Sequence, residues 1–203
     1  MNKNLIVLLH GVGSQGRDLQ GVADYWQRSL QNVIVAAPDA PFNFDMGTGF
    51  QWFSVNGITE ESRPTRVAVA RNAFDDTLNA LYQQYDIDPE NDRIILAGFS
   101  QGAIMALDAI VRGRHSLAGI IAFSGRLASP KPMQPKVDSS VLLIHGKSDQ
   151  VISWTESQKA AEELTAAGID VELSIEEGTP HTISIMGMAT ATTFIKKKVL
   201  PGN

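Results

Sequence analysis

The sequence predicts an α/β fold with a doubly wound, mostly parallel sheet of about six strands and helices on both faces. Two observations lead to this prediction. Short apolar runs rich in β-branched residues alternate along the chain with longer amphipathic runs. The short runs are apolar almost throughout, which is typical of parallel strands that are buried on both faces.

The expected elements follow one another in a regular order. Six short runs are expected to be strands: 5–9, 33–36, 93–97, 119–123, 141–145 and 171–175. Five longer runs are expected to be helices: 19–30, 64–84, 101–112, 154–167 and 182–198. Pro64 suits the first turn of its helix, and Gly168 follows the fourth helix as a stop. This order predicts strands connected by helical crossovers.

Length and composition narrow the class of protein. The 203 residues are typical of one α/β domain, so we expect a single domain over 1–203 without a separate lid domain. The chain has no cysteine, which excludes disulfides and thiolate nucleophiles and fits a cytoplasmic protein. A net charge of −5 argues against a nucleic-acid partner. No apolar stretch approaches the roughly 20 residues of a membrane span, so no stable membrane insertion is expected.

A short motif lies between the third expected strand and the helix after it. Gly98-Phe99-Ser100-Gln101-Gly102 is a G-x-S-x-G pattern in strand–turn–helix context. This context predicts a nucleophile elbow, in which a sharp turn holds the serine in a strained conformation and exposes its hydroxyl. The alternative is a glycine-rich turn with an incidental serine. We therefore take Ser100 as the candidate nucleophile.

A serine nucleophile needs a general base, and the chain has four histidines. Three of them follow expected strands, so location alone does not choose between them. In this architecture the order along the chain is serine, then the acid, then histidine. His115 leaves too little chain for a strand that carries the acid, and His145 lies in that strand. His181 is therefore the candidate base, against the alternative of a structural histidine in a turn.

The acid of such a triad is expected after the penultimate strand. Asp149 lies three residues beyond Gly146, where that strand ends, and it can orient the imidazole and stabilise its charged form. Asp170 precedes the last strand and so lies at the opposite edge of the sheet. Glu176 and Glu177 are close to His181 in sequence and are the main alternatives.

The tetrahedral intermediate of acyl transfer also needs two N–H donors for its oxyanion. One expected donor is the backbone N–H of Gln101, at the start of the helix after the nucleophile. The other is the backbone N–H of Val12, in the glycine-rich loop after the first strand.

The same loop permits a second interpretation. Residues 11–16 read Gly-Val-Gly-Ser-Gln-Gly, a literal G-x-G-x-x-G after a strand, and Asp39 follows the second strand. This pattern is found in Rossmann dinucleotide-binding domains. The Rossmann interpretation leaves the order of Ser100, Asp149 and His181 unexplained.

Several segments together resemble the phospholipase/carboxylesterase family of the α/β-hydrolase fold, which includes the acyl-protein thioesterases. They are the segments 8–13, 37–41, 51–60, 98–102, 144–149 and 178–181, and the resemblance extends over nearly the whole chain. The segment from Gln51 to Glu60 is closer to the bacterial esterase branch. Because the given sequence begins almost on its first core strand, the N-terminal hairpin of many relatives is expected to be absent, which predicts about six strands.

The resemblance implies a serine carboxylic-ester hydrolase that forms an acyl-enzyme, with Ser100, Asp149 and His181 as triad and Val12 and Gln101 as oxyanion donors. It implies no metal and no organic cofactor. The expected substrates are small-molecule esters with short or medium acyl groups, and thioesters remain open. Lysophospholipase and acyl-protein thioesterase activities are the alternatives. A non-catalytic binding module of this fold would need a broken triad, and none is visible.

Substrate choice is expected in the long excursion over residues 38–63, which is rich in glycine, asparagine and aromatic residues. Five aromatic residues are predicted to line an apolar groove for the acyl chain: Phe42, Phe44, Phe50, Trp52 and Phe53. Packing of these rings onto the core is an equally strong alternative. Ile183 and Met186, close to His181, are predicted to border the site. A homodimer through loop surfaces also remains open.

Overall fold

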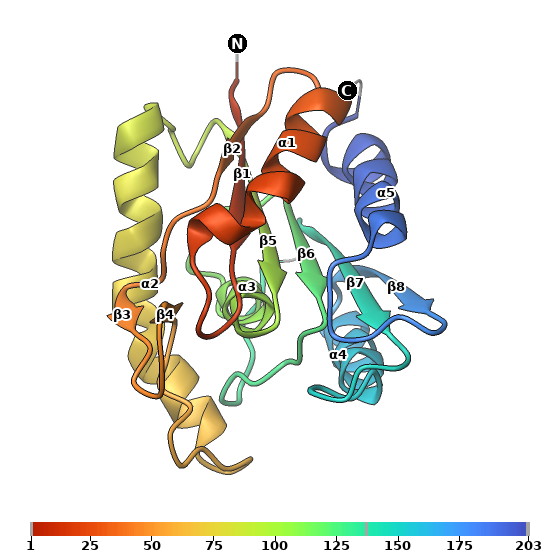
Figure 1. Cartoon of the computed structure of the whole chain (residues 1–203). Coiled ribbons are helices and arrows are strands. Elements are labelled where there is room, and N and C mark those ends of the chain that lie inside the picture. The colour runs from red at the N-terminus through yellow and green to blue at the C-terminus, as the bar shows by residue number, and fades with distance from the viewer. Residues whose placement is uncertain (1, 137, 202–203) are drawn as a thin grey trace.

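Six parallel strands form the central sheet of the structure, a computed structural model that describes residues 2–136 and 138–201 (Figure 1). The strands are β1 (Asn4–Leu9), β2 (Ile34–Ala36), β5 (Arg93–Phe99), β6 (Gly119–Phe123), β7 (Ser140–Gly146) and β8 (Asp170–Glu176). Their order is β2-β1-β5-β6-β7-β8, and every neighbouring pair is parallel. The predicted doubly wound sheet is confirmed. Its strand order reverses between β1 and β5, where α/β sheets open a crevice for ligands.

Helices cover both faces of this sheet. They are α1 (Gln20–Ser29), α2 (Arg63–Tyr85), α3 (Gln101–Val111), α4 (Thr155–Ala166) and α5 (Ile185–Phe194). A 3₁₀ turn, η1 (Gly16–Leu19), precedes α1, and a π turn, η2 (Ile195–Val199), follows α5. Within the described residues, no helix is both long and apolar enough to cross a membrane.

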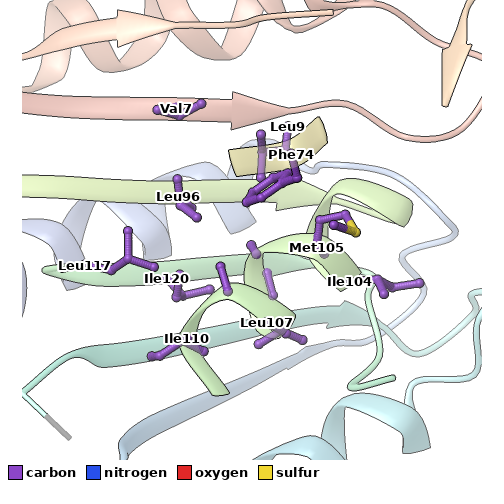
Figure 2. Packing of buried hydrophobic residues seen from close by; sticks show 14 of the residues in the cluster. Val7, Leu9, Phe74, Leu96, Ile104, Met105, Leu107, Ile110, Leu117 and Ile120 are labelled. Atoms are coloured by element: carbon purple, nitrogen blue, oxygen red, sulfur yellow. The ribbon is translucent and has the colours of Figure 1, made fainter. Parts of the chain in front are cut away.

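The strands direct alternate side chains to the two faces, so the core has two layers. Leu5, Val7 and Leu9 of β1 belong to the layer that also contains residues of α2, α3 and α4, whereas Ile6 and Leu8 belong to the layer with α1 and α5. Both sets are almost fully buried, which explains why the strand sequences are apolar throughout. Figure 2 shows part of the first layer, in which Phe74 of α2 lies beside β1 and β5 and Met105 extends from α3.

The last helix begins later than the sequence predicted. Residues 182–184 are not helical, and α5 starts at Ile185. Ser184 caps the helix, because its hydroxyl oxygen accepts a hydrogen bond from the Gly187 N–H at 2.7 Å. The three residues excluded from the helix form a loop directly after His181.

The excursion contains a small hairpin that the sequence did not predict. Strands β3 (Phe42–Asn43) and β4 (Phe50–Gln51) pair antiparallel. The hairpin is attached to the loop after β1, since the Gly13 N–H donates to Phe50 O at 2.8 Å and the Phe50 N–H donates to Ser14 O at 2.9 Å. These bonds place the middle of the excursion against the loop that carries Val12.

A buried ion network connects α2 to α3. The Asp108 carboxylate is fully buried and accepts hydrogen bonds from Arg71 at 2.8 and 2.9 Å, Arg114 at 3.1 Å and the Ser129 hydroxyl at 2.7 Å. Burial by itself raises the pKa of Asp108, but the hydrogen bonds from Arg71 and Ser129 and the two guanidinium charges hold it below its usual value. The network fixes α3, the helix that directly follows Ser100.

We expect the substitution Asp108→Ala to lower the free energy of unfolding by about 3–5 kcal/mol, because it leaves buried guanidinium charge uncompensated. Urea denaturation at neutral pH measures this loss. The control is Asp76→Ala, which removes an exposed carboxylate of α2 and should change the free energy of unfolding by less than about 0.5 kcal/mol. The pKa of Asp108 is lower in the folded state, so its contribution is present above about pH 4 and disappears in stronger acid. Equal losses in the two variants would contradict the role of the network.

Candidate active site

Ser100 lies on a tight turn between β5 and α3. Its backbone has φ 54° and ψ −114°, a conformation that residues with a side chain rarely adopt. The flanking glycines make the turn possible. A Cβ on Gly98 would lie 2.4 Å from the backbone N of Ala103, and one on Gly102 would lie 2.1 Å from Leu9 O. The predicted elbow geometry is therefore present.

His181 lies between Ser100 and Asp149. Its Nδ1 is 2.6 Å from Asp149 Oδ2, and its Nε2 is 3.0 Å from Ser100 Oγ. A carboxylate only accepts hydrogen bonds, so Nδ1 carries the ring proton and Nε2 is free to accept the serine hydroxyl proton. The Phe99 ring packs on the imidazole, with 4.8 Å between ring centroids.

The Asp149 carboxylate is buried and well provided with donors. Its Oδ1 accepts the N–H groups of Val151 and Ile152 at 2.8 and 2.9 Å. Burial raises the pKa of Asp149, but the bonds from His181, Ile152 and Val151 outweigh this effect and lower it below its usual value. Asp149 therefore stays ionised and can stabilise a protonated His181.

Backbone hydrogen bonds join the loop of the acid to the loop of the histidine. The Lys147 N–H donates to Glu176 O at 2.9 Å, and the Ser148 N–H donates to Thr179 O at 3.0 Å. Both loops follow neighbouring strands, β7 and β8, and continue their parallel pairing for a short distance. The separation of Asp149 and His181 is thus fixed by the sheet.

The two alternative acids are engaged elsewhere. Glu176 accepts the Ser184 hydroxyl at 2.7 Å, and Glu177 pairs with Lys147 at 2.6 Å. Neither glutamate hydrogen-bonds to the imidazole of His181. Of the three candidate acids, the structure brings only Asp149 to the base.

The two expected oxyanion donors lie at the same edge of the sheet, where the strands have their carboxyl ends. Val12 lies in the loop after β1, and Gln101 is the first residue of α3. Within residues 2–136 and 138–201, the N–H groups of both residues have no protein acceptor. The amino end of a helix also carries partial positive charge, which favours an anion there.

The side chain of Gln101 has a role that the sequence did not indicate. It is buried, its Oε1 accepts the Trp52 N–H at 2.7 Å, and its Nε2 donates to Phe53 O at 2.7 Å. One amide therefore pairs with the excursion backbone as a neighbouring strand would. Nothing in the motif predicts this contact, because the partners lie far apart in sequence.

This contact turns Trp52 and Phe53 away from the cleft at Ser100, and Phe53 lines a separate apolar groove of about 390 Å³ with Phe42 and Val69. That the rings of the excursion bind the acyl chain stays a prediction. Their exposed fractions are 1% and 3%, and both belong to the core. Trp52 packs on His10, and its Nε1–H donates to the His10 carbonyl at 2.9 Å. Phe50 is half-buried against the same core and lies outside the cleft at Ser100. Burial of large rings, each of 150–250 Å², favours this packing.

The cleft beside Ser100 has a volume of about 660 Å³ and takes its walls from other segments. Ile183 lines it, as expected, and its other apolar lining residues are Val12, Leu19, Val22, Phe99, Val151 and Met188. Asp18 is the one carboxylate among the lining residues. The Ser14 hydroxyl donates a hydrogen bond to Asp18 at 2.8 Å, and this bond is the main reason that the pKa of Asp18 is lowered.

The glycine-rich loop does not have the features of a dinucleotide site. The Gly16 N–H donates to Asp39 at 2.7 Å, and the Gly13 N–H donates to Phe50 O, so both groups are used within the protein. The strand order also differs from that of a Rossmann sheet. There a third strand lies beyond the second, whereas here β2 is an edge strand of the sheet. In the described part of the chain, no three His, Asp or Glu side chains could hold a metal ion.

His10 is a buried structural histidine in this loop. Its Nε2 accepts the Ala40 N–H at 2.9 Å, so its Nδ1 carries the proton and donates to Gly11 O at 2.7 Å. Burial lowers the pKa of His10, and the bond to Gly11 only partly offsets this effect. The neutral ring fixes the loop that precedes Val12.

Comparisons with known proteins agree with one another. A sequence model described as Phospholipase/Carboxylesterase matches residues 1–199. Esterase YpfH of Escherichia coli is 32% identical over 194 residues, covering 96% of this chain and 82% of that protein. Acyl-protein thioesterase 1 of Gibberella zeae is 24% identical over 218 residues, covering 98% and 92%. The crystal structure of esterase PE8 has a TM-score of 0.87 at 37% identity, covering 97% and 93%.

Stability should fall as the pH decreases below about 6.5, the usual pKa of histidine in an unfolded chain. Burial lowers the pKa values of His10 and His145, so the unfolded chain binds protons that the native state does not. The free energy of unfolding should then decrease by up to about 1.4 kcal/mol per pH unit for each histidine. Urea denaturation between pH 5.5 and 7.5 measures this slope. His10→Gln should make it shallower, and an unchanged slope would contradict the assignment.

Proposed function

The chain belongs to the phospholipase/carboxylesterase family, and on that premise we propose that Ser100, His181 and Asp149 form its catalytic triad. The protein is a hydrolase of the serine-esterase type. The hydrogen-bonded chain from Ser100 through His181 to Asp149 supports the triad most directly, with distances of 3.0 and 2.6 Å. It has the geometry of a nucleophile whose base is oriented by an acid.

In the first step, Ser100 Oγ attacks the carbonyl carbon of an ester held in the cleft. His181 Nε2 takes the hydroxyl proton, and the ionised Asp149 stabilises the resulting imidazolium. The carbonyl oxygen becomes an oxyanion, which accepts hydrogen bonds from the N–H groups of Val12 and Gln101. Neither donor needs to break a bond within the protein first, so the arrangement costs little reorganisation.

In the second step, the tetrahedral intermediate collapses. His181 returns its proton to the leaving alcohol or thiol, and the acyl group stays on Ser100 as an ester. Water then attacks this acyl-enzyme while His181 takes its proton. The intermediate collapses again, Ser100 recovers its proton, and the carboxylic acid is released.

Small-molecule esters with short or medium acyl groups are the proposed substrates. The apolar walls of the cleft, which include Ile183 and Met188, support the placement of an acyl chain beside Ser100. A thiol leaves at least as easily as an alcohol from the same intermediate. The relative named Acyl-protein thioesterase 1 therefore supports thioesters as a second candidate.

We expect Ser100→Ala to lower kcat for p-nitrophenyl butyrate at least about a thousandfold, because no other group can form the acyl-enzyme. The variant should remain folded, since the hydroxyl contributes little to packing. Steady-state hydrolysis measures the loss, and circular dichroism reports the fold. A fluorophosphonate probe should label the native enzyme and not the variant. Substantial turnover by the folded variant would refute the nucleophile.

Activity should rise with acyl length until the cleft is filled. Each buried CH₂ contributes about 0.8 kcal/mol, which corresponds to roughly a fourfold gain in kcat/KM. A series of p-nitrophenyl esters from acetate to octanoate measures the trend, and matched thioesters rank the two leaving groups. Ile183→Ser should flatten the trend. The exposed Met186, which lies outside the cleft, is the control: Met186→Ser should leave the trend unchanged. A flat series for the native enzyme would place the acyl group elsewhere.

A further inference from the structure

We propose that His145 is a positioning residue of the esterase: a buried imidazole whose single Nε2–H is shared between Ile152 O and Asp149 Oδ2, the oxygen that also binds His181. This proposal rests on the triad proposed above. Asp149 Oδ2 lies 2.6 Å from His181 Nδ1 and 3.2 Å from His145 Nε2. Two histidines therefore share one carboxylate oxygen.

The partners of His145 determine its tautomer. Its Nε2 lies 2.8 Å from Ile152 O and 3.2 Å from Asp149 Oδ2, and both of these atoms are acceptors. Nε2 must therefore carry the proton, which it donates to Ile152 O, the nearer acceptor, while Asp149 Oδ2 lies within reach of the same N–H. In a neutral ring Nδ1 is then an acceptor, and it receives the Ser157 hydroxyl at 2.6 Å. The hydroxyl of Ser157, on α4, thus supports the tautomer with its proton on Nε2.

The ring is suited to remain neutral. His145 has no exposed surface, and burial lowers its pKa. The titratable groups that interact with it are Asp149, which raises the pKa, and His181, which lowers it further when protonated. A charged His145 would cancel the negative charge that Asp149 presents to His181. A neutral one supplies a donor without adding charge.

The hydrogen bonds of Asp149 explain what this donor does. The N–H groups of Val151 and Ile152 both donate to Oδ1. No backbone N–H donates to Oδ2, which accepts a hydrogen bond from His181. In the proposed arrangement the Nε2–H of His145, 3.2 Å away, is a second and longer donor to Oδ2 and limits the rotation of the carboxylate. It also withdraws part of the electron density from Oδ2, which moderates the attraction between Asp149 and a protonated His181.

The result is a chain of five side chains that starts at a helix and ends at the nucleophile. Ser157 is hydrogen-bonded to His145, Asp149 to His181 and His181 to Ser100, and His145 Nε2 lies 3.2 Å from Asp149 Oδ2. The first two are buried almost completely, with exposed fractions of 1% and 0%. The rigid end of the chain therefore lies in the core, and the reacting end lies in the cleft.

The experiment compares His145→Leu with His145→Gln. Glutamine can place an amide N–H near the position of the imidazole Nε2–H, whereas leucine has no donor. His145→Leu should lower kcat about ten- to a hundredfold with little change in KM, because Asp149 and His181 lose their alignment. The acidic limb of its kcat/KM profile should also move to higher pH, because Asp149 without the His145 N–H attracts the proton on the neighbouring imidazole more strongly. His145→Gln should recover most of kcat and the native profile.

The matched control is His115→Leu, which removes a histidine that pairs with Asp75 away from the cleft. It should leave kcat and the pH profile unchanged whatever it does to stability. Equal losses in the leucine and glutamine variants, or an acidic limb that does not move upward in His145→Leu, would overturn the proposal. Loss of activity in proportion to loss of folded protein would do the same.

A measurement on the native enzyme keeps the proposal testable if the leucine variant does not fold. Nitrogen NMR of labelled histidine should show His145 neutral, with its proton on Nε2, throughout pH 6–8. A proton on Nδ1, or a charged ring, would overturn the proposal. Ser100→Ala separates the two levels of inference: if it abolishes turnover while His145→Leu leaves kcat and the profile intact, the triad stands and the role of His145 does not.

Discussion

The contact between Gly102 and the end of β1 is the constraint on which the site depends. A Cβ at this position would lie 2.1 Å from Leu9 O and 2.8 Å from His10 O, so the start of α3 packs directly on backbone. This contact brings the turn at Ser100 next to the loop that carries Val12. Both segments lie where the strand order reverses, so the crevice of the sheet and the proposed oxyanion site coincide. The positive φ of Ser100 persists because the surrounding backbone leaves no relaxed alternative.

Two buried carboxylates show how the fold separates structural from chemical charge. Asp108 is surrounded by the guanidinium groups of Arg71 and Arg114, so its charge is neutralised in place and serves to join helices. Asp149 is stabilised by two backbone N–H groups and by the imidazole of His181, and His145 Nε2 lies 3.2 Å away. Dipoles keep a carboxylate ionised without cancelling its charge, so Asp149 can still attract a proton that arrives on a neighbouring ring. The same residue type thus has different roles because its donors differ.

The sequence could predict that Ser100, Asp149 and His181 would meet, because each follows a strand whose apolar run is easy to identify and parallel strands end at one edge. It could not predict the sides to which Trp52 and Phe53 turn. That choice depends on the side-chain amide of Gln101, which lies far along the chain. The hairpin of β3 and β4 also escaped prediction, since strands of two residues have no periodicity. The tautomer of His145 is likewise set by neighbours that only the folded chain assembles.

The excursion is held by Gln101, whereas the walls of the cleft come from other segments, and this separation affects how the substrate range of such an enzyme can change. The apolar wall is built by residues around the start of α1, such as Leu19 and Val22, and by Met188 near the start of α5. None of these forms part of the elbow or of the contacts of Gln101. Point changes there can alter which acyl groups fit without disturbing the reaction centre. Insertions in the excursion would instead disturb its hydrogen bonds to Gln101 and so displace the start of α3. We therefore expect related enzymes to gain new substrates by substitutions in the cleft wall more often than by insertions in the excursion.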